Sequence, residues 1–142
     1  MMKISMHTPP EVDGPAATTG IDRAFKGRSG EETAALHLSG RGYIVIARNQ
    51  RTPVGELDLV CREQDVIVIV EVKARCSEEY GSPLEAIGPR KQRRMRAAAL
   101  WWLAERGFLP CRVRFDAVAV FLDAQGLPRC LQHVQNILSS EC

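Results

Sequence analysis

The chain has 142 residues, of which 45% are hydrophobic and 25% are charged, and its formal net charge is +2. This length and composition fit one globular domain with one core. The longest apolar run has eight residues (97–104), far below the ~18 that span a membrane. Residues 1–15 lack the apolar segment of a secretory signal. The five cysteines form no C-x-x-C pair, which indicates reduced thiols in a cytoplasmic protein rather than a disulfide frame or zinc site.

The N-terminal part of the chain combines a non-periodic segment with one helix and one short strand. Residues 1–26 are rich in Pro, Thr, Gly and small side chains, so we predict a flexible tail followed by a single domain over 27–142. Residues 30–42 carry apolar side chains at helical spacing and end in glycines, which predicts a helix. The β-rich run 43–47 predicts a strand, and 48–55 contains Asn, Pro and Gly and predicts a turn.

A β-hairpin is predicted next. Two apolar runs, 56–62 and 66–74, are separated by the three polar residues 63–65. Two strands joined by so short a connection pair antiparallel. The hairpin is followed by a loop with two prolines over 77–89.

The C-terminal part predicts the longest helix and a central strand. A Gly-Pro pair precedes residues 90–106 and a glycine follows them, which is typical of helix ends. Residues 113–122 are apolar on both faces and predict a central strand, and 130–142 add a short strand or turn. The order α-β-β-β-α-β predicts an α/β fold with a mixed central sheet flanked by helices.

Charged residues end the most apolar strand of the chain. The run 66–70 leads directly into Glu71 and Lys73, which leave the strand on one face. Cross-strand pairing in the hairpin can bring Asp58 opposite Glu71. Two close carboxylates favour a hard cation such as Mg²⁺ or Mn²⁺, and a lysine beside it suits phosphodiester hydrolysis. The alternative is that Glu71 and Lys73 form a self-neutralising structural pair.

The helix over 90–106 begins with an unusual density of positive charge. A helix N-terminus is already positive, so cations there are unfavourable unless an anionic partner offsets them. DNA phosphates would be such a partner, and binding would then be independent of sequence. The alternative is a solvated basic face. We expect Trp102 in the core with the apolar stripe of this helix rather than stacked on a base. The basic residues concerned are Arg90, Lys91, Arg93, Arg94 and Arg96.

Three further residues carry weaker signals. Glu31 opens the first predicted helix, where a carboxylate is favoured by the helix dipole alone. Asp116 interrupts an apolar strand and predicts a buried partner for an arginine. His133 is isolated in the sequence and receives no predicted role.

Several motifs in this order resemble the YraN-like bacterial family, which is itself similar to the PD-(D/E)xK nucleases and in particular to archaeal Holliday junction resolvases. The motifs are GRSGEETAALHL (27–38), GRGYIVIARN (40–49), GELDLV (55–60), VEVKAR (70–75), GSPLEAI (81–87), RKQRRM (90–95) and RFDAVAV (114–120). The resemblance covers about residues 24–137 and implies a restriction-endonuclease-like core. Leu57 stands where the motif label has proline, and residues 1–26 lie outside the resemblance.

The resemblance implies roles for individual residues. Asp58 and Glu71 would bind the metal, Lys73 would assist the attacking water, and Glu31 would be the acidic site residue of the first helix. Gln92 would match a polar residue of the second helix. With these roles, the expected nucleic-acid contacts are Arg90, Lys91, Gln92, Arg93 and Arg94.

The sequence therefore predicts a metal-dependent endonuclease that hydrolyses DNA, with branched or damaged DNA as candidate substrates. Because cutting branched DNA usually needs two active sites, a homodimer is expected. The alternative is a nucleic-acid-binding module of DNA repair or recombination that has lost efficient catalysis. No membrane partner is expected.

Overall fold

The computed structural model describes residues 4–7, 23–76 and 87–138, with side chains described over 30–76 and 87–138. The elements, in chain order, are β1 (Ile4–His7), α1 (Arg23–Gly40), β2 (Ile44–Arg51), β3 (Glu56–Glu63), β4 (Val66–Arg75), α2 (Pro89–Glu105), β5 (Arg112–Leu122) and β6 (Pro128–Val134). The loop predicted over 77–89 falls mostly outside the described residues.

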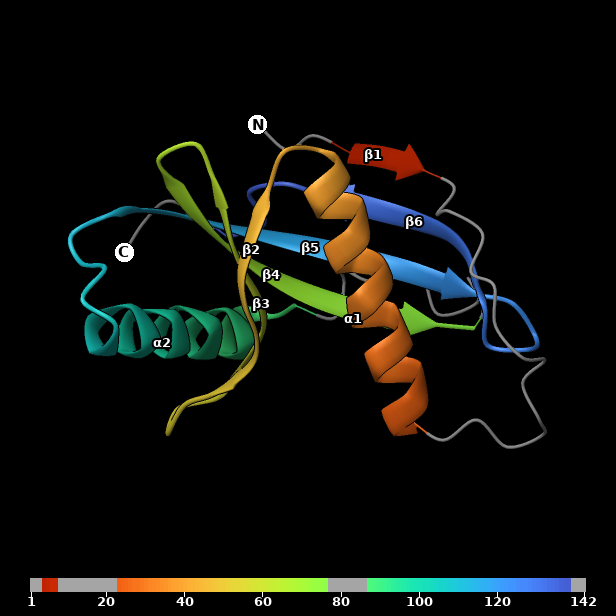
Figure 1. Ribbon diagram of the computed structural model, residues 1–142. Coiled ribbons are helices and arrows are strands. Elements are labelled where there is room, and N and C mark those ends of the chain that lie inside the picture. The colour runs from red at the N-terminus through yellow and green to blue at the C-terminus, as the bar shows by residue number, and fades with distance from the viewer. Residues whose placement is uncertain (1–3, 8–22, 77–86, 139–142) are drawn as a thin grey trace.

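All the strands join one sheet of order β1-β6-β5-β4-β3-β2, drawn in Figure 1. Strands β4 and β5 run parallel and are connected through α2, whereas the other neighbouring pairs are antiparallel. Strands β2 to β6 form a mixed five-stranded core, and β1 lies outside β6. The predicted α/β architecture with its mixed sheet is confirmed.

The two helices cover opposite faces of this sheet. Val68 and Val70 of β4 pack in one cluster with α1, whereas Ile67 and Ile69 pack in another with α2. Alternate side chains of a strand point to opposite faces, so β4 is covered on both sides. Trp102 of α2 is 2% exposed and belongs to the core, as predicted. None of the helices among the described residues is long and apolar enough to cross a membrane.

Strand β2 is longer than predicted. A turn was expected over 48–55, but Gln50 and Arg51 still pair with β3, opposite Leu57 and Glu56. The turn is confined to 52–55, where the Thr52 hydroxyl accepts hydrogen bonds from backbone N–H groups. The sequence predicts a turn here because these residues are polar. On an edge strand, however, polar side chains can remain in solvent while the backbone pairs normally with the neighbouring strand.

The structure differs from the N-terminal prediction in two places. The rest of the segment predicted as a tail, residues 1–3 and 8–22, lies outside the described residues. Residues 4–7 form β1, which pairs with β6 in the register Ile4 opposite Val134. Helix α1 begins at Arg23 instead of near residue 30. Composition alone misses such a strand, because a short segment can extend an open sheet edge mainly through backbone hydrogen bonds.

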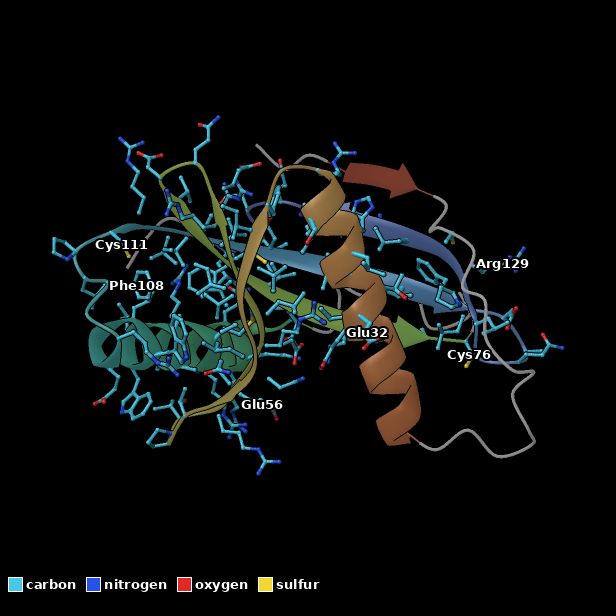
Figure 2. All side chains as sticks on the ribbon, in the orientation of Figure 1. Glu32, Glu56, Cys76, Phe108, Cys111 and Arg129 are labelled. Carbon is cyan, nitrogen blue, oxygen red and sulfur yellow. The ribbon has the colours of Figure 1, made fainter. Side chains whose placement is uncertain are left out.

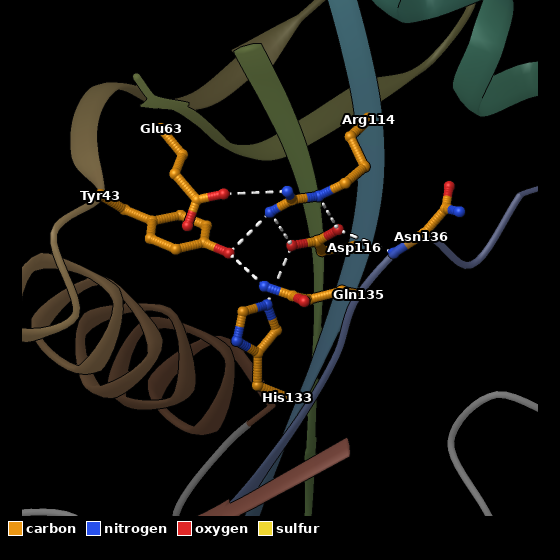
Figure 3. A network of polar contacts seen from close by, with 7 residues as sticks. All are labelled: Tyr43, Glu63, Arg114, Asp116, His133, Gln135 and Asn136. Carbon is orange, nitrogen blue, oxygen red and sulfur yellow. Dashed lines mark hydrogen bonds and ion pairs between the residues drawn. The ribbon is translucent and has the colours of Figure 1, made fainter. Parts of the chain in front are cut away.

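Asp116 is the centre of a buried polar network on β5, shown in Figure 3. Its carboxylate is fully buried and accepts hydrogen bonds from Arg114 at 2.9 and 3.0 Å, which confirms the predicted arginine partner. His133 Nε2 lies 2.9 Å from Asp116 Oδ2, so this histidine has a structural role that the sequence did not reveal. Burial would raise the pKa of Asp116, but the bonds from His133 and Arg114 outweigh it and the pKa is lowered.

Candidate active site

The β3–β4 hairpin brings Asp58 and Glu71 together. Backbone pairing of the two strands runs as far as Leu59 opposite Val70, and the same register places Asp58 opposite Glu71. Beyond Leu59 and Val70, a side chain of β3 accepts a hydrogen bond from the β4 backbone. Val72 N–H donates to Asp58 Oδ2 at 2.9 Å. The two carboxylates thus meet on adjacent strands, as the alternation and register predict.

The proximity of the two carboxylates perturbs Asp58. Burial, and then the negative charge of Glu71, raises the pKa of Asp58 from 3.8 to about 7, against the lowering effect of the bond from Val72. The charge of Glu31 contributes in the same direction. The ionised form of Asp58 is therefore unfavourable in this environment, and a nearby cation would stabilise it.

Two lysines contact Glu71 from different elements. Lys73 Nζ of β4 lies 3.5 Å from Glu71 Oε1, whereas Lys91 Nζ of α2 lies 2.6 Å from the same oxygen. Burial, and then the neighbouring Lys91, lowers the pKa of Lys73. Burial also acts to lower the pKa of Lys91, but its bond to Glu71 outweighs this and the pKa is raised. Glu71 is therefore paired mainly with a residue of the helix, and the self-contained Glu71–Lys73 pair is not the arrangement found.

Glu31 of α1 lies close enough to Asp58 and Glu71 to interact with their charges. The neighbouring Gly30 lets α1 lie against β4, because a Cβ there would be 2.8 Å from Ala74 Cβ. Burial raises the pKa of Glu31, and the charges of Glu56 and Glu71 raise it further. Since α1 begins at Arg23, Glu31 is not in the first helical turn, and the helix-dipole interpretation of this residue is wrong.

A pocket of about 570 Å³ opens beside the carboxylates. Asp58 and Glu71 lie in its wall with Glu56, whose position near α2 is labelled in Figure 2. The opposite wall is the N-terminal part of α2. It contributes Arg90, Lys91, Arg94, Met95 and Ala98, preceded by the N-cap residue Gly88, and the β2–β3 turn contributes Val54 and Gly55.

The predicted nucleic-acid residues divide into two groups in the structure. Arg90, Lys91 and Arg94 line the pocket. Arg93 is exposed but is not part of the pocket wall. Gln92 faces the start of its own helix, where its Nε2 donates to Ile87 O at 3.2 Å.

Sequence reasoning missed the contact between Lys91 and Glu71. The signal was present, because Lys91 precedes the buried Met95 by four residues and Ala98 by seven. This spacing puts all three on one face of the helix. Glu56 was likewise missed as a member of the pocket, although it shares a strand face with Asp58.

The donor set fits a hard divalent cation. Asp58 and Glu71 each offer a carboxylate on the pocket wall, where Val72 N–H contacts Asp58 Oδ2 and the two lysines contact Glu71 Oε1. Mg²⁺ is commonly held by one or two carboxylates, with water and phosphate oxygens as the remaining ligands. Within the described part of the chain, no group of three or more His, Cys, Asp and Glu side chains is arranged to hold a metal. Glu31 therefore does not complete a third protein ligand in this arrangement.

Together these features define an α/β protein with a mixed sheet and a cluster of two carboxylates and two lysines beside a basic helix. The chain belongs to the uncharacterised protein family UPF0102, whose family model matches residues 30–120. This range contains Glu31, Asp58, Glu71, Lys73 and Lys91, and the match bears out the YraN-like resemblance.

Curated relatives carry the same family name. A UPF0102 protein of Pelotomaculum thermopropionicum is 44% identical over 114 residues, covering 80% of this chain and 95% of the relative. One of Anaeromyxobacter dehalogenans is 47% identical over 82% of this chain and 86% of its own length. One of Syntrophotalea carbinolica is 48% identical over 69% of this chain and 80% of its own length.

Proposed function

We propose that this protein is a metal-dependent endonuclease that hydrolyses phosphodiester bonds of DNA with Mg²⁺ or Mn²⁺. One observation carries the proposal. Asp58 and Glu71 converge on adjacent strands, with Lys73 beside Glu71, at a pocket whose opposite wall is the basic end of α2. Carboxylates, a lysine and a phosphate-binding wall are the groups that metal-assisted phosphodiester hydrolysis requires.

Each residue has a chemical role in this proposal. Asp58 and Glu71 would hold the metal, which when bound polarises the phosphate and lowers the pKa of water. Lys73 donates hydrogen bonds toward the attacking water and the negative charge that develops on the phosphate. Glu31 acts on Asp58 through its negative charge, which raises the pKa of Asp58.

The N-terminal part of α2 would hold the DNA backbone. Arg90 and Arg94 line the pocket, and the helix has no acidic residue in its first turn to neutralise them. The positive end of the helix dipole reinforces their attraction for phosphate. We further propose that the substrate is branched DNA and that a homodimer would cut it at two points. Both proposals rest on the likeness to Holliday junction resolvases.

A second function is favoured by one contact. Lys91 Nζ lies 2.6 Å from Glu71 Oε1, so Glu71 is neutralised without any metal. Such a pair would suit a nucleic-acid-binding module of DNA repair or recombination that has lost efficient catalysis. This module would bind DNA equally with and without a divalent metal.

Cleavage of a panel of labelled DNAs separates the two functions. Linear, nicked, flapped and four-way-junction DNAs are incubated with Mg²⁺ or Mn²⁺ and the wild-type protein, Glu71→Gln or Glu32→Gln. Glu32 is an exposed carboxylate on α1 and serves as the matched control. The endonuclease proposal predicts cleavage by the wild type and Glu32→Gln and loss of cleavage in Glu71→Gln. DNA binding without cleavage of any panel member contradicts it and favours the binding module.

A further inference from the structure

We infer that Lys91 is a resident counter-ion of Glu71, that a divalent metal displaces it, and that the displaced ammonium then contacts the phosphate to be cleaved. This inference rests on the proposed metal-dependent function and adds a residue to it. Lys91 would thus be a second lysine of the site, supplied by α2 instead of the hairpin.

The geometry makes Lys91 the principal partner of Glu71. Its Nζ lies 2.6 Å from Glu71 Oε1, against 3.5 Å for Lys73. The Glu71 side chain is 12% exposed and that of Lys91 is 32% exposed. Both residues line the pocket, so the Lys91 ammonium sits on one oxygen of the carboxylate that a metal would bind.

The two cations compete for one carboxylate. A metal bound by Glu71 at ~2.1 Å would come within a few ångströms of the Lys91 ammonium, where two positive charges repel strongly. Helix α2 is anchored by the buried Met95 and Ala98, so its backbone stays in place. The flexible four-carbon stem of Lys91 is the part that is free to move.

Charge balance indicates where the displaced ammonium goes. A metal held by Asp58 and Glu71 would take Glu71 from Lys91, which would lose its 2.6 Å ion-pair partner. A phosphodiester brings one negative charge into the same pocket and gains a second as the attacking oxygen adds. Lys91 then faces this phosphate from the same wall as Arg90 and Arg94.

A purely structural ion pair between Lys91 and Glu71 makes the opposite prediction for metal binding. If the pair only held α2 to the sheet, removing Lys91 would loosen the site and weaken both metal binding and cleavage. If Lys91 competes with the metal, its removal strengthens metal binding while it slows cleavage. The signs of the two effects therefore distinguish the roles.

The first measurement is Mn²⁺ affinity of the full-length protein without DNA, from the free-Mn²⁺ signal in electron paramagnetic resonance. Lys91→Met removes the charge and keeps the stem, Lys91→Arg keeps the charge, and Arg94→Met removes a charge from the same pocket wall. We expect Lys91→Met to bind Mn²⁺ about tenfold more tightly than wild type, Lys91→Arg to resemble wild type, and Arg94→Met to differ by about twofold or less. Urea unfolding checks that each variant is folded.

The second measurement is single-turnover DNA cleavage at saturating Mn²⁺. We expect Lys91→Met to cleave at least about tenfold more slowly, despite its tighter metal binding. Unchanged cleavage overturns the phosphate contact. If the wild type binds Mn²⁺ and Lys91→Met binds it equally or more weakly, the competition is overturned and the endonuclease proposal stands. If neither the wild type nor any of these variants binds Mn²⁺, both proposals are overturned.

Discussion

Asp58→Asn should stabilise the protein, and the gain should grow with pH. The pKa of Asp58 is raised from 3.8 to about 7 by burial and by the Glu71 carboxylate. The folded state therefore binds this proton more tightly than the unfolded state, so Asp58 favours folding less and less as pH rises from about 4 to about 7. The amide of asparagine cannot ionise, and its oxygen can still accept the bond from Val72 N–H.

The size of the effect follows from the two pKa values. A difference of about three pKa units corresponds to about 4 kcal/mol at about 1.4 kcal/mol per unit. This whole amount applies at pH 8, above both values. At pH 5 the folded protein keeps Asp58 protonated, and the remaining penalty is about 2 kcal/mol. The stabilisation by Asp58→Asn should thus be about 2 kcal/mol larger at pH 8 than at pH 5.

Urea unfolding of wild type and Asp58→Asn at pH 5 and pH 8, in EDTA, measures this difference. Glu32→Gln, which changes an exposed carboxylate, is the control and should leave the unfolding free energy within about 0.5 kcal/mol of wild type. An equal effect of Asp58→Asn at the two pH values, or a loss of stability at pH 8, refutes the reasoning that burial and the Glu71 charge raise the pKa of Asp58.

Three other substitutions test separate parts of the structure. Asp116→Ala removes a fully buried carboxylate from its arginine and histidine partners, and should lower the unfolding free energy by about 3 kcal/mol or more in urea titrations. Gly30→Ala places a Cβ 2.8 Å from a β4 side chain and should cost about 1–2 kcal/mol, whereas Gly40→Ala meets nothing within 4 Å and should be nearly neutral in thermal unfolding. Arg94→Met should weaken DNA binding and reduce the slope of log affinity against log salt by about 1, whereas Arg129→Met, exposed on β6, should not. An unchanged slope in Arg94→Met excludes a phosphate contact there.

The meeting of Asp58 with Glu71 could be predicted because it depends on local rules. The sequence predicts a three-residue connection, whereas Glu63 already pairs with Val66 and the turn is the two residues Gln64 and Asp65. So short a connection fixes the register of the hairpin, and the alternation of side chains then places Asp58 and Glu71 on one face. The ends of α2 followed equally from Gly88, Pro89 and Gly107, which have strong local preferences.

The rest depends on contacts between distant segments. Strand β1 and the polar half of β2 are held by backbone pairing, which leaves little trace in side-chain patterns. The Lys91–Glu71 contact requires the angle at which α2 crosses the sheet, which a linear pattern does not specify. His133 acquires its partner only when β5 and β6 pair.

The rate of DNA strand cleavage by wild type and Lys73→Met, under single-turnover conditions with Mg²⁺, tests the central claim most directly. Lys73 contacts Glu71 and lies two residues from it on the same strand. The account predicts cleavage by the wild type and a loss of about 100-fold or more in Lys73→Met, with Mn²⁺ binding retained. Equal rates for the two proteins, or no cleavage by the wild type of any DNA in the panel, would contradict the assignment of this site as a nuclease.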